Sequence, residues 1–162
     1  MSRNSEIERK FLVKRLPTAQ ERGAASRIEQ GYFPITSKDF EIRLRRKDSK
    51  HLITFKKGRG LSRQEEEIEI PAARFRDLWP LTRAARITKH RYRIPWKKRT
   101  IELDVYQGSH RGLVTADVEF ESIRQSQSFH PPEWFGREIT GSKRYANRTL
   151  ARTRRLPQIK NS

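Results

Sequence analysis

The sequence contains no cysteine, so disulfide bonds and thiolate metal ligands are excluded and a reducing compartment is permitted. Apolar residues make up only 33% of the chain, and no uninterrupted apolar run approaches the roughly 20 residues of a membrane-spanning helix. The N-terminal residues are charged and do not form the apolar region of a secretory signal. We therefore expect a cytoplasmic protein with no membrane partner.

Acidic residues are scarce relative to basic ones. The 162 residues include 37 Lys and Arg against 19 Asp and Glu, which gives a formal charge of +18. This excess favours acidic partners, namely phosphate compounds, nucleic acid or an anionic membrane, and composition alone does not choose among them. The length suits one domain, which we expect over residues 1–152, followed by a basic tail over residues 153–162.

Eight segments of the chain alternate between polar and apolar residues with the period of a β-strand. Clusters of Gly, Pro, Asp and Ser separate them, and such short connections favour antiparallel neighbours. Two other stretches are predicted to be helical: residues 71–85, in which Pro80 should cause a kink or an early end, and residues 142–152. The expected strands are residues 4–14, 27–34, 40–47, 51–57, 62–70, 86–94, 98–106 and 113–121.

In nearly every expected strand one face is charged, with both signs present, and the other face is apolar. Two architectures fit this pattern: an open sheet or sandwich whose charged face meets solvent, and a closed barrel whose charged face lines the interior. Charges of one sign recur two residues apart, as in the carboxylates at 6 and 8 and the cations at 43 and 45. Because a solvated face would more often mix the signs, we predict a mainly β (α+β) fold. It is a closed eight-stranded antiparallel β-barrel, or tunnel, with a polar charged interior and a few helices packed outside.

The charged face predicts a metal and a phosphate substrate. Carboxylates without nearby His or Cys are hard oxygen ligands that select Mg²⁺ or Mn²⁺ over zinc, and the four histidines show no ligand spacing. Arg and Lys at alternating strand positions could hold successive phosphates of a linear substrate. Because acids outnumber bases on this face, it would repel a polyphosphate until a divalent metal binds. The combination describes metal-assisted attack of water on a terminal phosphate.

One motif and an ordered series of blocks carry a family resemblance. The segment EIERK at residues 6–10 matches the ExExK motif of the CYTH family, the triphosphate tunnel metalloenzymes. The following segments look like successive blocks of its short bacterial members, which together cover residues 6 to about 151: IEQGYF, FEIRLR, ITFKKG, EEEIEI, ITKHRY, IELDVY, GLVTADVEFE and EITGSKRYANRTLA. The chain resembles the inorganic triphosphatases of this family most, which implies an eight-stranded tunnel that hydrolyses triphosphate compounds with a divalent metal.

The resemblance also implies roles for individual residues. Lys10 and Tyr32 would be catalytic, with Tyr32 pairing with Lys10 to activate water; the alternative for Tyr32 is an aromatic residue at a strand end. Asp104 would be a further metal ligand or would orient water. The metal-binding residues would be Glu6, Glu8, Asp104, Glu119 and Glu121. The substrate-binding residues would be Lys10, Arg43, Arg45, Lys56, Lys89, Arg91 and Arg144, while Glu65, Glu67 and Glu69 would form ion pairs with the cations.

Several functions remain open on this pattern. Inorganic tripolyphosphate is the favoured substrate, but thiamine triphosphatases and class IV adenylate cyclases share the family's fold and motif residues. A different class is a non-catalytic protein that binds polyphosphate or RNA through its basic exterior. Nucleic-acid binding is not favoured because the chain has no recognised nucleic-acid motif. We expect a monomer or a homodimer.

Overall fold

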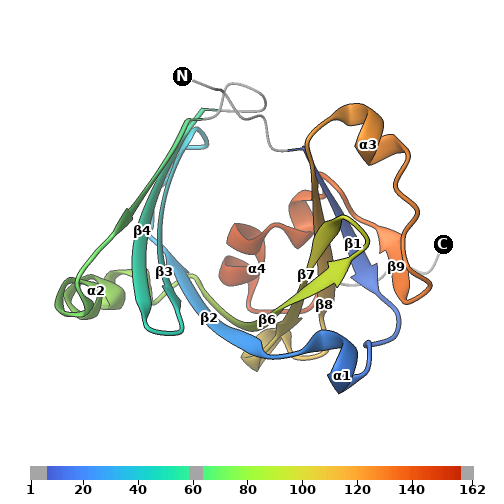
Figure 1. The fold of residues 1–162 in the computed structure, drawn as a ribbon. Helices are drawn as coiled ribbons and strands as arrows, with labels where there is room; N and C mark the ends of the chain where they lie inside the picture. Colours follow the sequence, from blue (N-terminus) through green and yellow to red (C-terminus); the bar gives the residue numbers. More distant parts are fainter. Residues whose placement is uncertain (1–6, 59–63, 158–162) are drawn as a thin grey trace.

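The computed structural model describes residues 7–58 and 64–157, which form a single antiparallel sheet of nine strands flanked by short helices (Figure 1). The strand order is β5-β4-β3-β2-β6-β7-β8-β1-β9. The strands are β1 (Ile7–Val13), β2 (Ala25–Tyr32), β3 (Phe40–Lys47), β4 (Lys50–Lys57), β5 (Gln64–Glu69), β6 (Arg86–Trp96), β7 (Arg99–Tyr106), β8 (Val114–Phe120) and β9 (Phe135–Glu138). The eight predicted strands are therefore present, and the predicted antiparallel pairing is confirmed.

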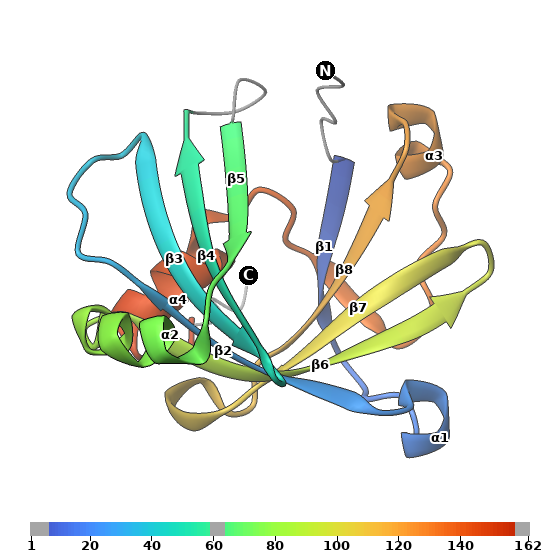
Figure 2. The same cartoon turned by 60° about the vertical axis from the view of Figure 1, so that its left-hand side comes forward.

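The sheet curls strongly, so that β5 and β1 stand on opposite limbs of a deep curve (Figure 2). Within residues 7–58 and 64–157 no ladder joins β5 to β1 or β9, so the predicted closed barrel is here a curled sheet whose hydrogen bonding does not close. A ninth, unpredicted strand explains part of the difference. β9 pairs with β1 on the side away from β8, through Phe11 with Glu138 and Val13 with Phe135. That edge of β1 is therefore not available to β5 there.

The helical segments are short. They are α1 (Ala19–Arg22), α2 (Ala72–Leu78), η2 (Trp79–Thr82), η3 (Gly108–His110), α3 (Ile123–Gln127), η4 (Lys143–Tyr145) and α4 (Asn147–Thr153). The predicted effect of Pro80 is confirmed, because the α-helix ends at Leu78 and continues as a 3₁₀ turn around the proline. The predicted helix over 142–152 is two pieces, since Ala146 between them is extended with ψ 134°.

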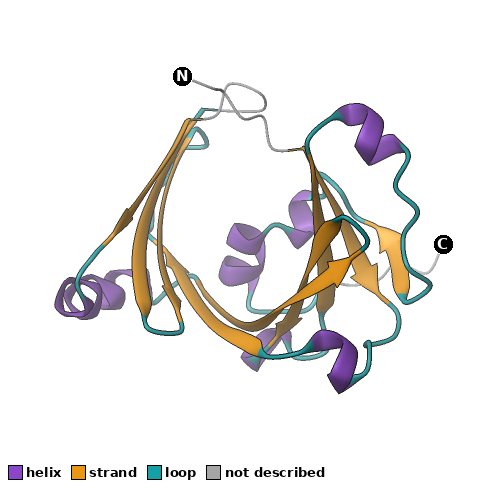
Figure 3. Cartoon of the chain, in the orientation of Figure 1, coloured by secondary structure: helices purple, strands orange, loops and turns teal. Residues whose placement is uncertain are grey.

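The helices lie on both sides of the curled sheet (Figure 3). Phe75 of α2 packs against His51 of β4 on the convex side, and α3 contacts β1 and β8. The predicted packing of helices outside therefore holds for α2 and α3. α4 is the exception: it lies within the curve, where Asn147 contacts Lys89 and Tyr106 on the concave face (Figure 1).

Two apolar clusters form the core. The first covers the convex side of β1, β7 and β8, where Phe135 of β9 packs over Phe11 and the preceding Trp134 packs against Phe135. The second lies around α4 and includes Tyr32, Tyr106, Tyr145 and Leu150. The apolar faces of β1, β7 and β8 pack as the alternation predicts, whereas Ile68 on the predicted packing face of β5 is 47% exposed. In the part of the chain that the structure describes, none of the helices has both the length and the apolar composition needed to cross a membrane.

Gly31 of β2 lies where the sheet and η2 approach closely. A Cβ atom on Gly31 would overlap Oγ1 of Thr82 and would lie 2.6 Å from Cβ of Thr82. We expect Gly31→Ala to lower the free energy of unfolding by about 1–3 kcal/mol, the usual cost of overpacking. Urea unfolding measures it, with Ser26→Ala on the same strand as the control that should change stability by less than about 0.5 kcal/mol. Equal stabilities of the two variants would contradict the predicted overlap.

Candidate functional site

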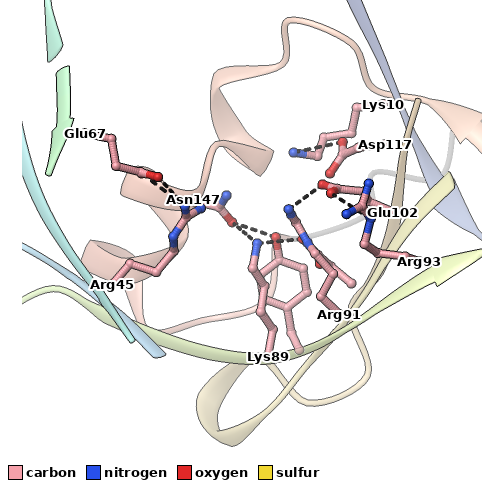
Figure 4. A network of polar contacts seen from close by, with 11 residues as sticks. Lys10, Arg45, Glu67, Lys89, Arg91, Arg93, Glu102, Asp117 and Asn147 are labelled. Carbon is pink, nitrogen blue, oxygen red and sulfur yellow. Dashed lines mark hydrogen bonds and ion pairs between the residues drawn. The ribbon is translucent and has the colours of Figure 1, made fainter. Parts of the chain in front are cut away.

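The charged faces of the strands form the concave face of the sheet. Figure 4 shows side chains from β1, β3, β6, β7 and β8 pointing into the curve. The pairing of β1 with β8 sets Glu8 opposite Glu119 and Lys10 opposite Asp117, so the charged positions of the two strands share one face. The prediction that these charges face inward is therefore confirmed for the described strands. Glu6 lies outside the described residues.

A buried ion-pair cluster occupies the centre of the concave face, on β6 and β7. Nζ of Lys89 donates to Oδ2 of Asp104 at 2.6 Å, and Nε of Arg91 donates to Oδ1 of Asp104 at 2.7 Å. Lys89 is 1% exposed and Asp104 0%. Burial lowers the pKa of Lys89 to about 8 although Asp104 opposes it. Despite burial, the two cations hold the pKa of Asp104 well below its usual range. Asp104 therefore holds both cations in place.

Lys10 and Asp117 form a second pair, across β1 and β8. Nζ of Lys10 lies 3.2 Å from Oδ1 of Asp117, which is 5% exposed. Burial raises the pKa of Asp117 to about 7, against the attraction of Lys10. Burial opposes the charge on Lys10, but Asp117 and Glu8 outweigh it and raise the pKa of Lys10. The inferred ligand set did not include Asp117, although its alternation with Glu119 and Glu121 places it on the same face.

The opposite limb of the sheet carries three of the predicted substrate-binding cations. Arg45 donates to both oxygens of Glu67, at 3.1 and 3.0 Å. Nη2 of Arg43 lies 3.6 Å from Glu67, and Nζ of Lys56 lies 2.9 Å from Oε2 of Glu65. The predicted ion pairing of Glu65 and Glu67 with the cations is therefore confirmed. These carboxylates lie on the edge strand β5, whose residues are all exposed, so an anion could replace them.

Tyr32 lies in the second apolar cluster and is 3% exposed, and within residues 7–58 and 64–157 its hydroxyl has Gln30 and Arg43 as side-chain partners. Its hydroxyl accepts a hydrogen bond from Nε2 of Gln30 at 2.7 Å, and it also bonds to Arg43. Burial raises the pKa of Tyr32 to about 12, against the nearby charge of Arg43. The structure therefore joins Tyr32 to a predicted substrate-binding arginine instead of to Lys10. Gln30, which the motifs did not single out, is buried beside it.

α4 brings Asn147 to the concave face, a contact that strand patterns could not predict. Oδ1 of Asn147 accepts from the hydroxyl of Tyr106 at 2.7 Å and lies 3.5 Å from Nζ of Lys89 (Figure 4). Arg148 anchors the helix further, since its Nη2 donates to the Ile35 carbonyl at 3.1 Å. The signal in the sequence was the segment RYANRTLA, which resembles a family block without indicating its contacts.

The inferred metal ligands are only partly brought together. Glu8 and Glu119 are opposite one another, and their oxygens are the ligand type that Mg²⁺ and Mn²⁺ prefer. Glu121 instead accepts a hydrogen bond from Gln125 of α3 at 3.0 Å, and both oxygens of Asp104 accept from Lys89 and Arg91. No group of three His, Cys, Asp or Glu residues suited to a metal occurs among residues 7–58 and 64–157. The chemistry of Glu8 and Glu119 fits a hard cation that needs further ligands.

The remaining predicted substrate residue is Arg144. It lies in η4 and is exposed, unlike Lys89. The motif residues on β1, β3, β4, β6, β7 and β8 therefore converge on one face, with Arg144 outside the strands that form it.

Comparisons with known proteins agree with this arrangement. The inorganic triphosphatase of Nitrosomonas europaea is 42% identical over 149 residues, which cover 91% of this chain and 97% of that protein. That of Acetivibrio thermocellus is 35% identical over 149 residues, covering 91% and 93%. A crystal structure of an inorganic triphosphatase matches with a TM-score of 0.74 at 39% identity, covering 91% of this chain and 95% of that one. The profile of the CYTH domain matches residues 4–153, and the chain belongs to the CYTH domain family.

Proposed function

We propose that the protein is a divalent-metal-dependent inorganic triphosphatase that hydrolyses the terminal phosphate of tripolyphosphate. The observation that carries the proposal is the concave face itself, where cations of β1, β3, β4 and β6 lie on the same surface as the carboxylates of β1 and β8. The relatives at 42% and 35% identity are both inorganic triphosphatases, which supports this substrate over thiamine triphosphate or ATP.

In this proposal, cations on both limbs bind the phosphates. On one limb, phosphate oxygens would replace the exposed carboxylates of β5 as the partners of Arg43, Arg45 and Lys56. A guanidinium group can bind two phosphate oxygens at once. On the other limb Lys10, Lys89 and Arg91 would bind the remaining phosphate oxygens. Asp104 would keep Lys89 and Arg91 charged and aligned before substrate arrives, so little reorganisation is needed on binding.

Glu8 and Glu119, with Glu6, would hold Mg²⁺ or Mn²⁺. When bound, such an ion neutralises phosphate charge and lowers the pKa of a water molecule. Lys10 would neutralise the developing charge beside them, held in position by Asp117 at 3.2 Å. Tyr32, whose pKa of about 12 keeps it protonated near neutral pH, would position Arg43 through their hydrogen bond. α4 would limit water at the far end of the face through Asn147 and Tyr106.

The experiment is a phosphate-release assay with tripolyphosphate, thiamine triphosphate and ATP, each with Mg²⁺, with Mn²⁺ and with EDTA. We expect release from tripolyphosphate to be fastest and to stop with EDTA. Faster phosphate release from thiamine triphosphate would instead support a thiamine triphosphatase. Formation of cyclic AMP from ATP would support an adenylate cyclase. Absence of turnover with any substrate, together with salt-sensitive RNA or polyphosphate binding, would favour the non-catalytic alternative.

Two arginines of β3 offer a matched test of the concave face. Arg43 lies on that face, whereas Arg46 lies on the convex one and contacts the ring of Phe75. We expect Arg43→Ala to lower kcat/KM for tripolyphosphate by about 10- to 100-fold, the value of one charged hydrogen bond. Arg46→Ala should leave kcat/KM within about twofold, since the ion pair with Glu29 and the ring contact that it removes both lie on the convex side, away from the proposed substrate. Similar losses in both variants would argue against substrate binding on the concave face.

A further inference from the structure

Asn147 of α4 presents a neutral amide on the concave face, and only the oxygen of this amide has partners. The hydroxyl of Tyr106 donates to Oδ1 at 2.7 Å, and Nζ of Lys89 lies 3.5 Å from the same oxygen. The nitrogen, Nδ2, carries two N–H groups. Within residues 7–58 and 64–157, Nδ2 has no hydrogen-bond partner. The amide therefore has donors to offer to a ligand.

The orientation of this amide is fixed by its neighbours. An ammonium group can only donate, so the oxygen of the amide, and not its nitrogen, must face Lys89. Lys89 is 1% exposed and Tyr106 0%, so both side chains are held in place. Leu150 and Ala151 of α4 are buried in the second apolar cluster, which holds the helix itself. Nδ2 therefore points away from Lys89 and Tyr106.

Nδ2 can be reached from the concave face. Asn147 is half-buried, and Nδ2 is not one of the buried nitrogen and oxygen atoms that lack a partner, so it keeps accessible surface. In the view of Figure 4 the amide lies between Arg45 on one limb of the sheet and Lys89 and Arg91 on the other. The two N–H groups therefore face the space between the two groups of cations.

The carboxylates that Figure 4 labels around this space already contact cations. These pairs are Glu67 with Arg45, Asp117 with Lys10, and Glu102 with Arg91. The amide of Asn147 thus lies beside donors and beside acceptors that are already in use. Because polar groups enclosed in a binding site are nearly always hydrogen-bonded, an anion entering this space is the acceptor that suits Nδ2.

We propose that Asn147 is a substrate-binding residue, which donates from Nδ2 to a phosphate oxygen of a chain lying between the two limbs. This inference rests on the proposed function, because it takes the ligand of the concave face to be a triphosphate. The amide adds a donor without adding charge beside Lys89 and Arg91. Since Tyr106 and Lys89 hold the amide in position before the ligand arrives, little ordering is needed on binding.

Two variants of Asn147 separate a bond to the substrate from a role in packing. Asn147→Asp keeps an oxygen for Tyr106 and Lys89 but replaces the donor with a negative charge. Asn147→Ala removes the amide without adding charge. We would measure the Kd for diimidotriphosphate, whose bridging nitrogens resist hydrolysis, by calorimetry with Mg²⁺. Asn147→Ala should raise this Kd about 3- to 10-fold, the effect of losing one neutral hydrogen bond. Asn147→Asp should raise it by about tenfold or more, because the carboxylate also repels phosphate.

Gln127→Glu is the matched control for charge. It makes the same change from amide to carboxylate at an exposed position of α3, outside the concave face, and should leave Kd within about twofold. Urea unfolding is the second measurement, because an Asn147 that only packs would lower the stability of Asn147→Ala and leave Kd unchanged in both variants.

The outcomes distinguish this inference from the proposed function. Unchanged Kd values in both Asn147 variants, in a protein that hydrolyses tripolyphosphate, would overturn the role of Asn147 alone. The expected rise of Kd, in a protein that releases no phosphate from any triphosphate, would support Asn147 and reject the proposed function. Absence of analogue binding by the unmodified protein would overturn both.

Discussion

Replacing Asp104 with asparagine is expected to lower the free energy of unfolding by about 3–5 kcal/mol, the cost of removing one partner from a buried ion pair. Asp104 is fully buried, and its two oxygens accept from both Lys89 and Arg91. Arg91 would keep its contact with Glu102, but the single oxygen of asparagine cannot accept from both cations in the way the two oxygens of Asp104 do, and its amide would place a donor against one of them. An ammonium group would then lie buried with no carboxylate in contact.

Urea unfolding at neutral pH measures this loss, with Glu138→Gln as the control. Glu138 pairs with Arg9 at 2.6 Å, but its side chain is 39% exposed. Exposed pairs contribute about 0–1 kcal/mol, so the control should remain close to the unmodified protein. If Asp104→Asn and Glu138→Gln lowered stability equally, the cluster on β6 and β7 would have no special energetic role.

The Glu8→Gln variant is expected to lose turnover by about 100-fold or more, since a metal contributes several kcal/mol of transition-state stabilisation. This expectation follows from the proposed metal-binding role of Glu8. Glu8 is exposed on the concave face opposite Glu119, and glutamine keeps its shape while removing the charge. The fold should therefore survive, and the remaining activity should require more Mg²⁺ or Mn²⁺ to saturate.

Phosphate release from tripolyphosphate at several metal concentrations measures the effect. Glu66→Gln is the matched control, because Glu66 is an exposed glutamate of β5 that pairs with Phe55 on the convex side of the sheet. It should retain activity within about twofold, as expected for a surface substitution far from the reacting groups. Full activity in Glu8→Gln would remove Glu8 from the proposed metal site.

The local pattern of the chain accounted for the strands and for the side of the sheet on which each charge lies. Period-two alternation predicts both, because consecutive side chains of a strand point to opposite faces. β9 was not predicted, since its four residues, Phe135–Glu138, are too few to show alternation and depend on pairing with β1. The position of α4 within the curve could not be predicted from the sequence pattern either, because helical periodicity does not indicate which surface of the sheet a helix will cover.

For the candidate site, too, some features follow from the sequence and others only from the tertiary structure. The sequence by itself determined that Lys10, Arg43, Lys89 and the acids of β1 and β8 would share one charged face, because strand parity is local. Only the tertiary structure decided their partners: Asp104 holds Lys89 and Arg91, Asp117 holds Lys10, and Tyr32 bonds to Gln30 and Arg43. The physical reason is that register, curl and burial select partners among charges distant along the chain, and burial then sets their pKa values.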